Sequence, residues 1–217
     1  MDILTAPLDE ASKTLGRKIC ESLLSNGYKS AVYIDTVSEA LQAASDMIPD
    51  GVTVGVPGTV TVRQIGLIPK LENRGCRVIH HWDPSLTPEE KLERLIGENA
   101  ADWFVTSSNA ITFDGKMVNI DGVGNRVAAI AWGPGKLLFV IGMNKAARDV
   151  ESAIARVRDV AAPPNSKRVG LGTPCTELGH CDDCSSPQRA CRAVLILERA
   201  PFGREAHVIL VGEALGY

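Results

Sequence analysis

The sequence predicts an α/β domain with a mostly parallel sheet, and three observations support this fold class. Five short runs rich in Val, Ile and Leu alternate with helical stretches along the 217 residues. The runs are continuously apolar rather than alternating, as expected of strands that are buried on both faces. Aromatic residues make up only 5% of the chain, so we expect a core built from aliphatic side chains.

The elements follow from these patterns in chain order. Residues 8–26 carry apolar residues at helical spacing and end at Asn26-Gly27, a signal for a helix C-terminus. The expected strands of the main sheet are Ala31–Ile34, Val52–Gly55, Arg77–Ile79, Trp103–Thr106 and Lys136–Ile141. The further helices are expected at 37–48, 59–74, 87–99, 124–131 and 146–161.

Two regions depart from this rhythm. The segment Ile111–Val118 places Asp114-Gly115 between two apolar stretches, which predicts a hairpin. After Ala161, Pro163-Pro164-Asn165 is expected to stop the helix, and Val194–Leu197 and His207–Val211 are expected to form a second pair of strands. We therefore expect a single domain over 1–217 with a Cys-rich C-terminal extension at 162–217, and leave open that this extension folds back as a distinct lobe.

Composition and charge exclude several classes of function. Hydrophobic residues make up 45% of the chain, charged residues make up 23%, and the formal net charge is −3, so nucleic acid is not an expected partner. No apolar run approaches the ~18 residues of a membrane span. The N-terminal residues lack the basic and apolar regions of a secretory signal. These features favour a cytoplasmic protein in which structural disulfides are rare.

A ligand pocket is expected beyond the carboxyl ends of the strands, where open α/β sheets bind their ligands. Small, amide and charged residues follow four of the expected strands, and the loops that carry them converge on one edge. The loops are Gly55–Thr59, Ser107–Asn109, Asn119–Arg126 and Gly142–Lys145. The candidate ligand-binding residues are Gly55, Gly58, Thr59, Asn109, Asp121, Gly122, Gly124, Asn125, Arg126, Asn144 and Lys145.

The segment Asn119–Arg126 is the strongest part of this prediction. Its two glycines, two asparagines, aspartate and arginine open a helix, where backbone amides capture anions. The alternative is that it forms only a turn and a helix cap. Gly55-Val-Pro-Gly58 has the same alternative, because it matches no complete dinucleotide motif. Lys145 is either a surface charge or a partner for an anionic ligand.

No catalytic nucleophile is identified from the sequence. The chain has no Gly-x-Ser-x-Gly motif and no evident Ser, His and Asp set. His80 and His81 follow the third strand and could reach the edge of the pocket. Histidines in such positions more often cap or pack, so we expect a structural role for both.

Four cysteines in the C-terminal region give the sharpest chemical signal. Cys175, Cys181, Cys184 and Cys191 have the spacing Cys-x5-Cys-x2-Cys-x6-Cys, and the central Cys-x2-Cys is a usual chelating unit. We expect a metal or iron–sulfur site here; zinc and a [4Fe–4S] cluster both accept four cysteines, and free thiols or disulfides are the alternative. His180 is a conceivable further ligand, whereas Cys20 and Cys76 are expected to be buried packing residues.

Several motifs resemble those of the LUD (lactate utilisation) domain family over about Gly51 to Tyr217. They are Thr106–Thr112, Val118–Ala129, Met143–Lys145 and the tail that begins at Thr173-Pro-Cys. The resemblance implies a NagB/RpiA/CoA-transferase-like fold with α/β/α layers, whose relatives bind CoA thioesters, sugar phosphates or folates at the strand ends. It also implies a role in the oxidation of L-lactate to pyruvate beside iron–sulfur oxidoreductase subunits.

The sequence therefore supports two hypotheses about function. The first is an accessory subunit for the oxidation of lactate or a related hydroxy acid, with an iron–sulfur or other metal site. The second is a binding protein or transferase-like enzyme for a CoA-like or phosphorylated ligand, with a structural zinc. Both expect an anionic small-molecule ligand, and self-association into a homo-oligomer is left open.

Overall fold

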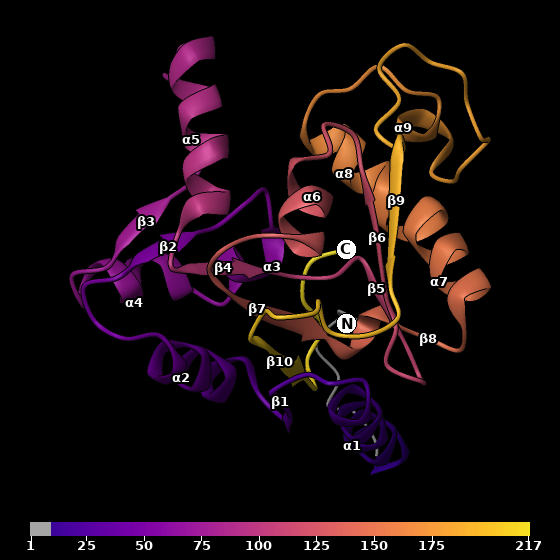
Figure 1. The fold of residues 1–217 in the computed structure, drawn as a ribbon. Helices are drawn as coiled ribbons and strands as arrows, with labels where there is room; N and C mark the ends of the chain where they lie inside the picture. The colour runs from indigo at the N-terminus through magenta and orange to yellow at the C-terminus, as the bar shows by residue number, and fades with distance from the viewer. Residues whose placement is uncertain (1–9) are drawn as a thin grey trace.

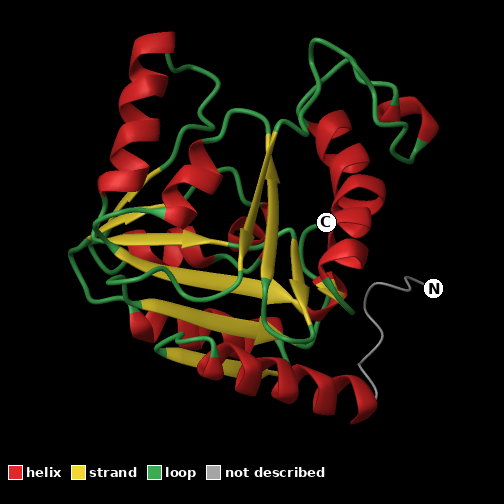
Figure 2. Ribbon diagram, turned by 45° about the vertical axis from the view of Figure 1, so that its right-hand side comes forward, coloured by secondary structure: helices red, strands yellow, loops and turns green. Residues whose placement is uncertain are grey.

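The chain is seen in a computed structural model that describes residues 10–217, so Leu8, at the start of the first expected helix, lies outside the described residues. Its larger sheet has six strands that are parallel at every pairing, as the sequence predicted (Figures 1 and 2). In spatial order these are β1 (Ser30–Ile34), β10 (Ala206–Val211), β7 (Lys136–Gly142), β4 (Trp103–Thr106), β2 (Thr53–Gly55) and β3 (Arg77–Ile79).

Both faces of this sheet are buried. Along β7, Leu137 and Phe139 belong to one apolar cluster, whereas Leu138 and Val140 belong to another, because successive side chains of a strand point to opposite faces. The helices of the sheet are α1 (Glu10–Ser25), α2 (Val37–Met47), α3 (Val60–Gln64), α4 (Leu67–Glu72), α5 (Pro88–Ala100) and α6 (Asn125–Ala131). The continuous apolar runs in the sequence therefore correctly predicted strands that are buried on both faces.

A second, smaller sheet packs against the face that α1 also covers. Its order is β8 (Ala146–Ala147), β5 (Ala110–Thr112), β6 (Met117–Asp121) and β9 (Ala193–Leu197). The expected hairpin is confirmed, since β5 and β6 are antiparallel and Gly115 takes a positive φ of 81° at the turn. Ile111 and Met117 of this sheet share the core cluster of α1. One face of the main sheet is thus covered by a sheet as well as by helices.

Val194–Leu197 and His207–Val211 form strands, as expected, but not a separate pair beside the main sheet. β9 pairs with β6 in the small sheet, whereas β10 lies between β1 and β7 in the large one. All six residues of β10 are buried, which its apolar sequence favours because a central parallel strand is covered on both faces. The tail is therefore not an appended extension, since it supplies a central strand of the main sheet (Figure 1).

Two of the expected helices are interrupted. The helix expected at 59–74 forms as α3 and α4, separated at Gly66, which takes the left-handed conformation with φ 75°. The helix expected at 146–161 begins instead with β8, and α7 (Val150–Arg156) starts only after Asp149, which caps it.

Pro163 and Pro164 do not stop the helical path, contrary to expectation. A π-helical turn, η3 (Val157–Ala161), follows α7 and leads directly into α8 (Ala162–Arg168). The two prolines, which cannot donate backbone hydrogen bonds, follow directly on this π-helical turn. Residues of η3 and α8 form one wall of the cavity described below.

Candidate functional site

A cavity of about 790 Å³ lies where the carboxyl ends of β2, β3, β4 and β7 meet the small sheet. Its walls come from the loops that follow these strands, from η3 and α8, and from the cysteine-containing loop. Basic side chains dominate the charged groups in the wall: they are Arg63, Lys91, Arg126, Lys145, Arg168, Arg189 and Arg192, against Asp83 and Asp121. The cavity therefore has the charge balance of a site for an anion.

Most of the residues that the sequence suggested as ligand-binding lie in the wall of this one cavity. They are Gly58, Thr59, Asn109, Asp121, Gly122, Asn125, Arg126 and Lys145. The loops converge as expected, although β5 and β6 belong to the small sheet, so the cavity lies between two sheets and not along the edge of one.

Three of the suggested residues lie elsewhere and have structural roles. A Cβ on Gly55 would stand 2.0 Å from the Glu98 carbonyl oxygen, so glycine lets α5 approach β2. Gly124 takes φ 93° at the start of α6. Asn144 accepts a hydrogen bond from the Leu215 amide at 3.0 Å and so ties down the C-terminal segment.

Lys145 lies at the floor of the cavity, in the 3₁₀ turn η2 (Met143–Lys145) that ends β7. Its side chain is 3% exposed, and Nζ donates to Thr61 Oγ1 and Ser107 Oγ at 2.9 Å each. No carboxylate pairs with it among residues 10–217. Burial, together with the charges of Arg156 and Arg126, lowers the pKa of Lys145 from 10.5 to about 7.

Two arginines lie close enough to this lysine to act on it with their positive charge. Arg156 donates to the carbonyls of Asn144 and Asn109, and burial lowers its pKa to about 10. Arg126 donates to Ile120 and Asn109, and burial lowers its pKa as well, opposed by the charge of Asp121. Lys145, Arg126 and Arg156 are thus three partly or fully buried cations. Within residues 10–217, Asp121 is the one carboxylate that contacts any of them, with its Oδ2 3.8 Å from Arg126 Nε.

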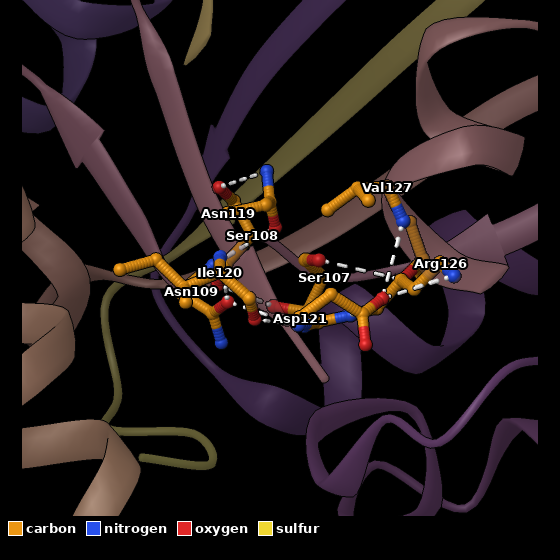
Figure 3. A network of polar contacts seen from close by, with 9 residues as sticks. Ser107, Ser108, Asn109, Asn119, Ile120, Asp121, Arg126 and Val127 are labelled. Atoms are coloured by element: carbon orange, nitrogen blue, oxygen red, sulfur yellow. Dashed lines mark hydrogen bonds and ion pairs between the residues drawn. The ribbon is translucent and has the colours of Figure 1, made fainter. Parts of the chain in front are cut away.

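Amide side chains hold the loops around this group in place (Figure 3). Asn119 lies within β6, fully buried, where Nδ2 donates to Ser108 Oγ and Oδ1 accepts from the Asn109 amide. Asn109 Oδ1 in turn accepts from the Ile120 amide and from Arg126. Asp121 accepts from the amides of Arg126 and Val127 at the start of α6. This segment was suggested as a ligand loop, and much of its polarity is used in cross-links between loops.

Sequence reasoning missed several polar groups of the cavity. Thr61 in α3 and Ser107 after β4 accept hydrogen bonds from Lys145, but a hydroxyl group in the sequence carries no signal of such a partner. Thr59 was among the suggested residues, and the structure adds that it is 4% exposed and that its Oγ1 has no hydrogen-bond partner among residues 10–217. His81 was expected to cap or pack; it lies in the cavity wall, with Nδ1 2.6 Å from Glu98 Oε1. Glu98 is 1% exposed, which its place in a charged helix did not indicate.

The four C-terminal cysteines lie in the loop that includes α9 (Cys175–Leu178), and all are free and half-buried. Cys191 also lines the cavity. Burial raises the pKa of Cys191, and the charges of Cys181 and Cys175 raise it further, so these thiols lie close enough to interact. Within residues 10–217, however, no three His, Cys, Asp or Glu side chains form a group that could hold a metal ion. Cys20 and Cys76 are buried, as expected.

No helix in the described part of the chain is long and apolar enough to cross a membrane.

Comparison with known proteins shows the family. No curated protein matches the chain. The crystal structure of a DUF162 family protein from Deinococcus radiodurans has a similar fold, with a TM-score of 0.52 and 16% sequence identity over 94% of this chain and 99% of that one. The LUD domain family matches residues 17–211, which include both sheets and the cavity. The chain therefore belongs to the LUD domain family.

Proposed function

We propose that this protein binds a small organic anion in the cavity between its two sheets, as a component of the utilisation of lactate or a related hydroxy acid. Membership of the LUD domain family supports the connection with lactate utilisation. The observation that carries the binding proposal is Lys145, a buried lysine that lines a cavity and has no carboxylate partner within residues 10–217. A buried amino group without a carboxylate partner loses its proton more readily, and an anion from outside the chain would hold it in its charged form.

The surroundings of Lys145 would strengthen its attraction for an anion. Arg126 and Arg156 add positive charge close enough to lower the pKa of Lys145, and a bound anion would relieve this repulsion. Charge–charge attraction is also several times stronger in a partly dry site than in water. Thr59, with its buried hydroxyl that has no partner within residues 10–217, offers a further hydrogen bond to a ligand.

A phosphorylated or CoA-like ligand is the second candidate, and the size of the cavity favours it. The volume of about 790 Å³ falls in the range of roughly 300–1,000 Å³ that is usual for ligands of drug size. A three-carbon hydroxy acid would fill only a small part of this space. The additional basic residues that line the cavity, Arg63 and Arg168 among them, suit a ligand with more than one anionic group.

A thermal-shift screen with lactate, pyruvate, sugar phosphates, nucleotides and CoA esters tests both candidates. We expect stabilisation by anionic compounds, because a ligand that binds only the folded state raises the melting temperature. Lys145→Met should abolish the shift, and Asn125→Ala should reduce it. Lys18→Met, which removes an exposed lysine of α1, is the matched control and should leave the shift unchanged.

The outcome separates the candidates. A shift with hydroxy or keto acids alone would support the first, and a shift with CoA esters or sugar phosphates would support the second. An equal shift in the wild type and in Lys145→Met would place the anion elsewhere and refute the proposal.

Metal binding by Cys175, Cys181, Cys184 and Cys191 is a further part of the proposal. The four thiols share one loop, and Arg189 donates to the carbonyls of Cys184 and Cys191 within it. As they stand, the thiols do not form a metal site; Cys181 Sγ, for example, accepts from the Asp183 amide. Binding would require the loop to close around a zinc ion or a [4Fe–4S] cluster.

The metal content of protein purified without oxygen tests this part. Four thiolates predict either one zinc or about four irons and four sulfides per chain. Cys184→Ser should remove the metal, whereas Cys20→Ser should not, because Cys20 is buried in α1. Metal-free wild-type protein would refute it. Iron–sulfur oxidoreductase subunits as partners, a cytoplasmic location and self-association remain predictions.

A further inference from the structure

A second group of polar side chains lines the same cavity at the ends of β2 and β3. His81 Nδ1 lies 2.6 Å from Oε1 of Glu98, which projects from the last turn of α5. Glu98 is 1% exposed, and its backbone lies directly against Gly55 of β2. The pair therefore joins the loop after β3 to a helix that is fixed against β2.

The contact with Glu98 sets the chemical state of the histidine ring. When Glu98 is ionised it only accepts hydrogen bonds, so Nδ1 of neutral His81 then carries the hydrogen and Nε2 the lone pair. Burial raises the pKa of Glu98, and the hydrogen bond and charge of His81 oppose this rise. A carboxylate behind an imidazole in this way orients the ring and stabilises the imidazolium once a proton is taken up.

The other ring nitrogen belongs to a residue that lines the cavity. A Cβ on Gly58 would stand 3.9 Å from His81 Nε2 and 3.9 Å from Trp82 Nε1, which is ordinary van der Waals contact, so Gly58 lies beside both atoms. His81 Nε2 has no hydrogen-bond partner among the described residues, and neither does the buried Trp82 Nε1. Thr59, the neighbour of Gly58, also has its buried hydroxyl without a partner there.

We propose that His81, oriented by Glu98, is a catalytic acid–base residue that exchanges a proton with a hydroxyl group of the bound anion. The proposal rests on the anion-binding function and names its substrate class, which is an organic anion that carries a hydroxyl group. The O–H bond of the ligand breaks and an N–H bond forms at Nε2, while the electron pair stays on the ligand oxygen. The reverse step returns the proton to that oxygen.

The proximity of this group to Lys145 supports one ligand for both. Gly58 faces His81, and Thr61, three residues later, accepts from Lys145 Nζ at 2.9 Å. Three residues span at most about 10 Å even when fully extended. A ligand of several heavy atoms would therefore reach from the anion site at Lys145 to the base at His81. Glu98 acts through His81 and is a positioning residue.

Nuclear magnetic resonance of the imidazole nitrogens of the wild-type protein tests the first half of the inference. Neutral His81 should be a single tautomer, with hydrogen on Nδ1 and a lone pair on Nε2. Glu98→Gln should shift the Nε2 resonance toward the donor region, because an amide both donates and accepts and no longer selects one tautomer. Neutral His81 with its hydrogen on Nε2 in the wild type would overturn the proposal.

Modification by diethyl pyrocarbonate, followed by peptide mass spectrometry, tests the second half. His180 is the internal reference, since it is exposed and its Nδ1 contacts the Leu178 carbonyl, which leaves Nε2 free in solvent. His81 should react at Nε2. A bound hydroxy-anion identified by the thermal-shift screen should slow its reaction at least about tenfold at saturation, while His180 keeps its rate.

The outcomes distinguish this inference from the proposed function. Failure of inorganic sulfate to bind near Lys145 in calorimetry would refute the anion site and the proton-transfer role with it. Binding of sulfate together with an unreactive His81, or with no protection of His81 by the hydroxy-anion, would overturn the acid–base role alone. Protection in the wild type that is lost in Lys145→Met would support both.

Discussion

Replacement of Lys145 by methionine removes a cation from a site that is 3% exposed while keeping a side chain of similar length. The pKa of this lysine falls from 10.5 to about 7 on folding, so the unfolded chain binds more protons than the folded one between these two values. The unfolding free energy of the wild type therefore carries a penalty that is present in full below about pH 7 and is relieved as the pH rises toward 10.5.

The expected magnitude follows from the two pKa values. A tenfold change in proton affinity corresponds to about 1.36 kcal/mol, so integration from about pH 6 to about pH 9 gives a gain of about 2.5 kcal/mol in the wild type from this group alone. Lys145→Met lacks this gain. It also leaves the hydroxyls of Thr61 and Ser107 without their present partner, at a cost that does not depend on pH.

Urea denaturation of both proteins at about pH 6 and about pH 9, followed by tryptophan fluorescence, measures the difference. The other ionisable groups are common to the two proteins, so the change in their stability difference with pH isolates Lys145. Lys18→Met should behave as the wild type. Parallel stability curves for the wild type and Lys145→Met would refute the depressed pKa and the unpaired, buried state of this lysine.

Two further substitutions test how the fold positions the cavity. Gly55→Ala should destabilise the protein by at least about 2 kcal/mol in denaturant melts, since the new Cβ would overlap the backbone of Glu98. Gly58→Ala should cost far less, because no atom would lie nearer than 3.9 Å to its Cβ. Equal losses of stability in the two variants would contradict the packing described for α5. Asn144→Ala should cost about 1 kcal/mol and increase amide exchange at Leu215, whose hydrogen bond it removes; unchanged exchange would show that this contact is not formed in solution.

The strands of the fold could be predicted from sequence because their signal is local. Continuous apolar runs identified Trp103–Thr106 and Lys136–Ile141 as strands buried on both faces, which they are. Which strand pairs with which is not a local property. His207–Val211 has the composition of a central strand, but nothing nearby in the sequence indicates that it inserts between β1 and β7.

The site could be predicted only in outline, for the same reason. Loop positions after strands indicated that Gly58, Asn109 and Lys145 would come together, because parallel strands end at a common edge. The burial of Lys145 and Glu98 depends on what packs over them from distant elements. A helix such as α5, with charged residues at six of its 13 positions, gives no sign that its Glu98 is the one that turns inward.

The central claim is that an anion binds beside a lysine that is largely neutral above about pH 7. Isothermal titration calorimetry with sulfate, which does not titrate in this range, tests it most directly when done at about pH 8 in two buffers of different ionisation enthalpy. Binding should draw a proton onto Lys145, so we predict an uptake approaching one proton per sulfate in the wild type and none in Lys145→Met. Sulfate binding without proton uptake in the wild type, or with equal uptake in both proteins, would contradict the account.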